Sequence, residues 1–323
     1  DFSSCILPAF DVSPYSNLYP NPKIIGQSLR WLYEADKNSK NLVFFASLKG
    51  LLQKTLPYKQ FKDHSLTLKC QQDLPDDFSQ KLHSWGYHLT PIVEDPGTFS
   101  IKGGIIDVYS PANEYPFRIE LFGDQIETIK YFDPETQLSI RNTNFVSIIP
   151  AKEVIYADSD RKKIIDEYKK TLTSDFENNI EIQETISALA QARFFHGIEF
   201  LLPCFFENTE SPLEYFTEPL ELWLCQHNEM ATAYDHFLSD LKTEFETQKD
   251  NYLRIPYEKI YGIFESLESS LLDETKKVYF NNILIKENVD DFSEDPLVYD
   301  SYSLEEFRTN CKNLFRDKEK YNS

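Results

Sequence analysis

The chain has 323 residues, 41% of them hydrophobic and 15% aromatic, and this apolar content excludes a disordered protein and is enough for a buried core. Its 53 acidic residues outnumber 33 basic ones, so the formal net charge is −20, and nucleic-acid binding would need a local basic stripe. At roughly 150 residues per domain, the length predicts about two domains.

The five cysteines are widely spaced and form no C-x-x-C pair, a pattern that favours reduced thiols in a cytoplasmic protein. No apolar run approaches the roughly 18 residues of a transmembrane helix, so we expect no membrane partner. Because the chain begins at Asp1, we interpret it as a fragment of a longer protein.

The first 64 residues show the pattern of an α/β fold. Apolar residues three to four apart predict a helix over 22–34, and the apolar run 42–45 predicts a buried strand. Ser47 follows as a candidate N-cap of a further short helix. Strand, tight turn and helix in this order indicate a parallel sheet. Another strand is expected at 65–70, followed by a helix that runs to Trp85 and ends at Gly86.

Between about residues 90 and 150 the pattern changes to strands separated by turns, which predicts a small, largely antiparallel β-module. Gly123-Asp124 is a candidate two-residue hairpin turn, and we interpret Lys102-Gly103-Gly104 as a strand bend or bulge. The expected strands cover residues 97–102, 105–109, 117–122, 125–132 and 145–149.

After this module the sequence again favours helices, with short strands between them. The last thirty residues are polar and acidic. Helices are expected over 161–171, 184–193, 229–248 and 256–272, and strands over 220–225 and 278–285.

No nucleotide or metal site is predicted in this chain. A P-loop needs a glycine followed by Lys and Ser or Thr, and this order does not occur. Cys225 and His227 lie close together but have no second ligand cluster that would complete a metal site. We therefore expect no catalytic residues and no cofactor.

The segment 117–132 has the clearest surface pattern. Because side chains alternate along a strand, Arg118, Glu120 and Phe122 share one face and the apolar residues between them face the core. A two-residue turn would add Ile129 and Tyr131 to the same face, together with Gln125 and Glu127. Two interpretations remain open: a helix covers Phe122 and Ile129, or the face binds a protein, since Arg and aromatic residues are enriched at binding hot spots.

Two motifs in this region resemble a known family. Residues 96–109 (PGTFSIKGGIIDVY) and 116–133 (PFRIELFGDQIETIKYFD) resemble the UvrB-like module shared by the excision-repair subunit UvrB and the bacterial transcription-repair coupling factors. Residues 7–15 (LPAFDVSPY) and 197–206 (GIEFLLPCFF), followed by 212–216 (PLEYF), resemble the coupling factors in particular. The resemblance covers most of residues 1–285.

The resemblance implies an α/β fold with a split helicase-like domain, RecA-like but degenerate, that holds an inserted small α+β domain rich in antiparallel β-structure. Residues 1–64 would be the first part of the α/β domain, truncated at its start. Residues 65–150 would be the inserted UvrA-binding domain and 151–290 the second part of the α/β domain. Residues 291–323 would form an acidic linker or the start of a further domain.

The function implied is that of a non-catalytic module that recruits UvrA to stalled RNA polymerase for nucleotide excision repair. Matched residue by residue, the UvrA-contacting positions fall on Lys102, Arg118, Glu120 and Phe122. The family usually has Arg in place of Lys102, and lysine lacks the bidentate fork of arginine. UvrB has a further Arg where this chain has Ser100.

The resemblance also implies features of a longer parent protein. That protein would be an ATP-dependent DNA translocase, with ATP and magnesium bound only by its motor domains. Domains outside this chain would bind RNA polymerase and DNA, and a C-terminal domain would mask the UvrA-binding face. The alternative function is the N-terminal part of a UvrB-type helicase motor that itself binds ATP and damaged DNA.

Overall fold

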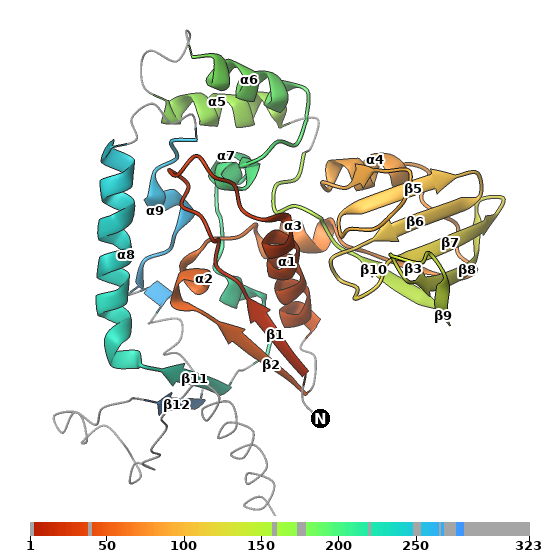
Figure 1. The fold of residues 1–323 in the computed structure, drawn as a ribbon, viewed down its shortest axis with the longest axis horizontal. Helices are drawn as coiled ribbons and strands as arrows, with labels where there is room; N and C mark the ends of the chain where they lie inside the picture. Colours follow the sequence, from red (N-terminus) through yellow and green to blue (C-terminus); the bar gives the residue numbers. More distant parts are fainter. Residues whose placement is uncertain are drawn as a thin grey trace, which may run out of the picture. The chain divides into compact units, whose positions relative to one another are not determined.

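The computed structural model describes residues 3–37, 41–156, 160–172, 179–218, 221–247, 253–264, 266–267 and 276–280. The fold is mixed α/β, with helices and several small sheets (Figure 1). The acidic segment predicted at 291–323 and the end of the strand predicted at 278–285 lie outside the described residues.

The chain starts with a strand–helix–strand unit, as the sequence predicts. Strand β1 (Ser3–Leu7) pairs in parallel with β2 (Leu42–Ala46), and α1 (Pro22–Lys37) connects them. The side chain of Ser47 accepts a hydrogen bond of 3.1 Å from the backbone N–H of Gly50, so Ser47 is the predicted N-cap of α2 (Leu48–Leu52).

Two short helices and a strand lead into the β-module. Helix α3 (Tyr58–Asp63) precedes β3 (Leu66–Lys69), which pairs antiparallel with β10 (Phe145–Ile148), a strand from the far end of the module. Helix α4 (Phe78–Ser84) ends just before Gly86, whose positive φ of 88° suits the turn after the helix. The chain therefore enters and leaves the β-module through one pair of strands.

Among the described residues, six strands in the order β4-β5-β6-β7-β8-β9 form the largest sheet, and Figure 1 labels β5 to β9. Strand β4 pairs in parallel with β5, and all later neighbours are antiparallel. The bounds are β4 (His88–Leu89), β5 (Thr98–Lys102), β6 (Ile105–Tyr109), β7 (Phe117–Phe122), β8 (Gln125–Phe132) and β9 (Ser139–Thr143). Strand β9 is absent from the predicted elements, because its polar sequence SIRNT carries no apolar alternation.

Two-residue turns join β5 to β6 and β7 to β8. The second, at Gly123-Asp124, is the predicted hairpin turn, since Phe122 pairs with Gln125. The first corrects the interpretation of Lys102-Gly103-Gly104 as a bend or bulge: Lys102 pairs directly with Ile105, and Gly103 has a positive φ of 61°. A glycine adopts this left-handed conformation without steric cost, which allows the tight turn.

A β-bulge in β8 makes the prediction for Ile129 and Tyr131 wrong. The register shifts between Glu120 and Leu121, so that Leu121 faces Ile126 but Glu120 faces Thr128. One extra residue in β8 reverses the side-chain alternation beyond that point. Ile129 consequently lies opposite Ile119 and is buried.

We call the apolar side of the six-stranded sheet its inner face and the side that carries Arg118 its outer face. Side chains of the inner face are buried in one core cluster together with Phe78 and Leu82 of α4. The buried inner-face residues are Phe99, Ile106, Val108, Phe117, Ile119, Ile126 and Ile129.

Helices dominate the second half of the chain. Helix α5 (Arg161–Thr171) has the predicted bounds and packs on α6 (Ile180–Ala190). Helix α6 begins four residues before the predicted start because the side chain of Asn179 caps it through a 3.1 Å hydrogen bond from the Ile182 N–H. Short helical turns follow: η2 (Ile198–Leu201), α7 (Leu202–Phe205) and η3 (Pro212–Tyr215).

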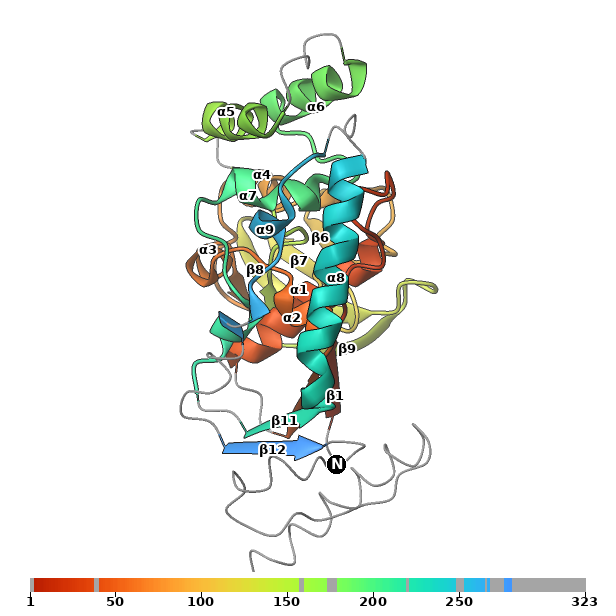
Figure 2. The same ribbon diagram turned by 90° about the vertical axis from the view of Figure 1, so that its left-hand side faces the viewer.

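Helix α8 (His227–Thr247) contacts α2 and α9 (Figure 2). The helix predicted over 256–272 is interrupted: α9 (Tyr257–Ile260) ends where Tyr261 becomes extended and bridges Gln53. Residues 264 and 266–267 are helical again, and residues 265 and 268–272 lie outside the described residues. Strands β11 (Glu221–Cys225) and β12 (Lys276–Phe280) pair in parallel.

Segments on either side of the β-module contact one another. Isolated bridges pair Gln53 with Tyr261 and Thr55 with Glu210, and the Thr55 hydroxyl donates a 2.9 Å hydrogen bond to the buried carboxylate of Glu153. Residues before and after the module therefore share one core. Among the described residues, no helix combines the length and apolarity needed to cross a bilayer.

Candidate protein-binding site

The outer face of the six-stranded sheet carries its polar side chains in rows across the strands. In the first row Asp107, Arg118 and Lys130 are direct cross-strand partners. A second row aligns Lys102 and Ile105 with Glu120 and Thr128. Phe122 lies beyond both rows at the β7–β8 turn. The register therefore brings all four predicted site residues to the same face.

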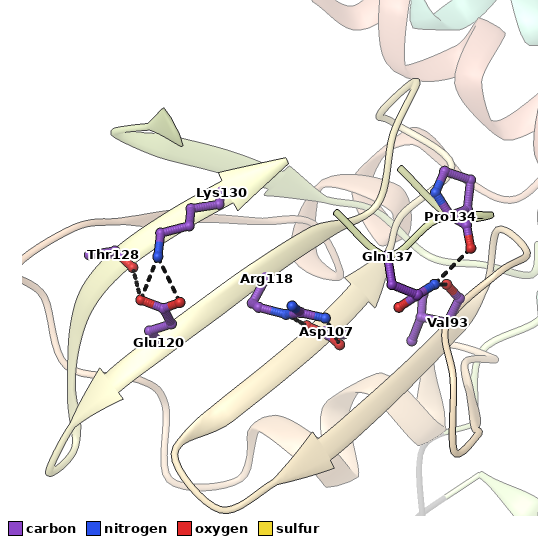
Figure 3. Close-up of polar contacts among 8 residues, drawn as sticks. All are labelled: Val93, Asp107, Arg118, Glu120, Thr128, Lys130, Pro134 and Gln137. Carbon is purple, nitrogen blue, oxygen red and sulfur yellow. Dashed lines mark hydrogen bonds and ion pairs between the residues drawn. The ribbon is translucent and has the colours of Figure 1, made fainter. Parts of the chain in front are cut away.

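Arg118 is held by a carboxylate on the neighbouring strand (Figure 3). Its Nε donates to Asp107 Oδ1 at 2.7 Å and a terminal nitrogen donates to Oδ2 at 2.9 Å, the bidentate geometry that arginine favours. The guanidinium carbon also lies 4.9 Å from the ring centroid of the buried Phe132. The hydrogen bonds to Asp107 raise the pKa of Arg118 above its usual value.

Glu120 is likewise held by side chains of a neighbouring strand, here β8 (Figure 3). The Lys130 ammonium donates to both carboxylate oxygens at 2.7 and 2.8 Å, and the Thr128 hydroxyl donates to Oε2 at 2.7 Å. These hydrogen bonds, chiefly those from Lys130, lower the pKa of Glu120. Glu120 is consequently ionised at neutral pH.

Phe122 and Lys102 project from the outer face into solvent. Phe122 is 78% exposed, whereas Ile129 is only 1% exposed and lies on the inner face. The interpretation in which a helix covers both residues is therefore wrong. Lys102 is exposed, and within the described parts of the chain its ammonium forms no ion pair.

Loops fold against each other at the opposite end of the sheet from the two-residue turns. The Gln137 side-chain amide donates to the backbone oxygens of Pro134 and Val93 at 2.7 and 3.2 Å (Figure 3). Val93 is fully buried, and Ser100 and Asp107 are also buried. The accessible part of the outer face is thus the half nearer Phe122.

Comparisons with known proteins assign the six-stranded sheet to a known domain family. Residues 66–154, which include the whole six-stranded sheet, match the UvrB interaction domain family. A transcription-repair-coupling factor of Myxococcus xanthus is 32% identical over 230 residues, which is 66% of this chain and 19% of that protein. The chain carries a UvrB interaction domain and is a relative of the transcription-repair-coupling factors.

Other relatives have the same name and similar coverage. The transcription-repair-coupling factor of Staphylococcus haemolyticus is 29% identical over 68% of this chain and 20% of its own length. That of Escherichia coli K12 is 24% identical over 81% of this chain and 23% of its own length. The chain therefore spans about a fifth of the length of these coupling factors.

Sequence reasoning did not identify Asp107, Lys130 and Thr128 as neighbours of the site. Asp107 lies within the UvrB-like motif at residues 96–109, but its contact with Arg118 depends on the register between β6 and β7. Lys130 and Thr128 reach Glu120 only because the β8 bulge turns them to the outer face. A bulge leaves no clear mark in a single sequence, so these partners required the tertiary structure.

The described residues contain no group of three or more His, Cys, Asp or Glu side chains placed to hold a metal ion. One ionisable group away from the outer face has an unusual environment: burial raises the pKa of Glu153 to about 7. Glu153 lies beside Thr55 in the core that joins the two sides of the β-module.

Proposed function

We propose that this chain is the part of a coupling factor that binds UvrA through the outer face of the six-stranded sheet, and so recruits UvrA to stalled RNA polymerase for nucleotide excision repair. One observation carries the proposal: Lys102, Arg118, Glu120 and Phe122 share one face within the UvrB interaction domain.

The chemistry of this face suits a protein partner. Burying a phenylalanine that is 78% exposed contributes about 2 kcal/mol, and aromatic residues and arginine are typical anchors of binding interfaces. Lys102 has no ion pair within the described residues, so a carboxylate of UvrA would complement it. We call Lys102, Arg118, Glu120 and Phe122 the proposed contact set. It combines an exposed apolar anchor, a cation without an ion pair among the described residues and two ionised groups that are held in place by hydrogen bonds.

The affinity of UvrA for the 323-residue chain and its variants, measured by calorimetry, tests this proposal. Arg118→Glu and Phe122→Ala should each weaken binding by on the order of 2 kcal/mol, which is about 30-fold. Phe145→Ala is the matched control because Phe145 is 55% exposed but lies on β10, outside the six-stranded sheet. Unchanged affinity in both site variants, with folding intact by circular dichroism, would refute the site.

We also propose that residues 1–64 and 151–290 are two parts of one degenerate helicase-like domain, into which residues 65–150 are inserted, and that 291–323 form a linker or the start of a further domain. The bridges from Gln53 to Tyr261 and from Thr55 to Glu210 support the pairing of the two parts. Limited proteolysis should cut at the borders of the insert and leave the two outer parts associated.

In this proposal the chain itself is not an enzyme. ATP hydrolysis, magnesium binding, DNA translocation and the contact with RNA polymerase would belong to other parts of a cytoplasmic protein about five times longer, since the chain covers about a fifth of its relatives. The isolated chain should show no ATPase activity with or without duplex DNA. Hydrolysis above the level of a buffer control would favour a motor function instead.

A further inference from the structure

Two side chains outside the proposed contact set hold two of its charged members, Arg118 and Glu120, in place. Asp107 binds Arg118 and Lys130 binds Glu120. We propose that Asp107 and Lys130 are positioning residues that fix Arg118 and Glu120 in their binding geometry before UvrA arrives. This inference rests on the proposed function and concerns the same face.

The position of Asp107 favours this role over that of a contact residue. Its side chain is only 10% exposed, whereas that of Arg118 is 25% exposed, so Arg118 offers more surface to an approaching protein than Asp107 does. A guanidinium has five N–H donors, and two of them bind Asp107. The remaining donors stay available to acceptors of the partner, while Asp107 and Phe132 fix the plane of the group.

Lys130 on β8 fixes Glu120 on the neighbouring strand β7. Both carboxylate oxygens accept from its ammonium, and Thr128 supplies a third donor. A glutamate on an exposed strand would otherwise sample several rotamers, and ordering such a side chain on binding reduces affinity by about 2- to 10-fold. The contacts in the free protein remove most of that loss.

Each of the two pairs is also electrically neutral. Asp107 and Glu120 balance Arg118 and Lys130 across adjacent strands, which leaves little net field from this network. Charges that are paired within one protein add little long-range attraction. The contribution of Lys130 should therefore persist when salt is raised, unlike that of a residue that attracts UvrA directly.

A double-mutant cycle on the 323-residue chain tests the inference by calorimetry with UvrA. Lys130→Gln should weaken binding by about 2- to 10-fold, and Lys130→Arg should restore most of the affinity because it keeps the cation. In the Glu120→Gln background, Lys130→Gln should change affinity by less than about 2-fold, because the group that it positions is gone. Lys81→Gln is the control, since Lys81 on α4 pairs with Asp77, just before that helix, and α4 packs with the inner face.

The outcomes separate this inference from the proposed function. If Arg118→Glu and Phe122→Ala weaken binding but Lys130→Gln does not, the positioning role is wrong and the site stands. If Lys130→Gln weakens binding equally with and without Glu120, Lys130 acts in another way and the inference is also wrong. Unchanged binding in all these variants would refute the proposed function itself. The cycle uses Lys130 and not Asp107, because an Asp107 single variant would leave the part-buried Arg118 guanidinium without its counterion.

Discussion

Arg118 on β7 and Asp107 on β6 face each other across the sheet and form two parallel hydrogen bonds of 2.7 and 2.9 Å. The carboxylate is the more buried of the two partners. Removing arginine from such a pair leaves a buried charge without its counterion, and this is more costly than losing the pair as a whole.

We predict that Arg118→Met lowers the free energy of unfolding by about 1–3 kcal/mol, and that adding Asp107→Asn recovers part of this loss. The physical reason is that the second change removes the unpaired carboxylate, while methionine keeps the packing on Phe132. Urea denaturation of both variants measures the difference. A double variant less stable than the single one would contradict the argument.

Glu153 should make the stability of the chain fall as pH rises. Burial raises its pKa to about 7, whereas in the unfolded chain the group has the usual glutamate value near 4.3. Both states are protonated at low pH. As pH rises from about 4.3 to about 7, Glu153 ionises in the unfolded chain but stays protonated in the folded protein, so the unfolded state becomes more favourable. The difference of about 2.7 pKa units corresponds to a loss on the order of 4 kcal/mol at 1.36 kcal/mol per unit.

Glu153→Gln should abolish this part of the pH dependence, because the amide does not ionise. Unfolding free energies of both proteins between pH 5 and 8 test the prediction. Glu167→Gln is a suitable control, since Glu167 lies on the surface of α5 and pairs with Lys170. Parallel pH profiles for the original chain and Glu153→Gln would count against a raised pKa.

Two glycine substitutions should have opposite effects. Gly86 has a φ of 88°, and an added Cβ would overlap the side chain of Lys152, so Gly86→Ala should destabilise by more than about 1 kcal/mol. Gly26 lies within α1 with nothing within 4 Å of an added Cβ, so Gly26→Ala should stabilise by about 0.5–1 kcal/mol. Thermal unfolding of both variants checks the signs, and equal shifts would contradict the role of Gly86.

The masking domain that the family resemblance implies gives a prediction about the longer protein. If another domain of a full-length coupling factor covers Phe122, the 323-residue chain should bind UvrA more tightly than the full-length protein does. Phe122 is the best reporter, because its 78% exposure would be lost on masking. Equal affinities of the two proteins for UvrA would rule out masking at this face.

Much of the local structure was predictable because it depends on neighbouring residues. The cap at Ser47, the turn at Gly123-Asp124 and helix α5 follow from short-range patterns, and the structure confirms each of them. The errors have tertiary causes. The helix predicted over 256–272 is interrupted at Tyr261 because this residue pairs with Gln53, a residue far away in the sequence.

By itself the sequence determined that Arg118, Glu120 and Phe122 share a face, because alternation along one strand is a local property. Only the tertiary structure decided what surrounds them. The Gly103-Gly104 turn brings Lys102 into the row of Glu120, and the β8 bulge turns Thr128 and Lys130 outward and Ile129 inward. Register and bulges are set by packing between strands, so a pattern within one strand cannot specify them.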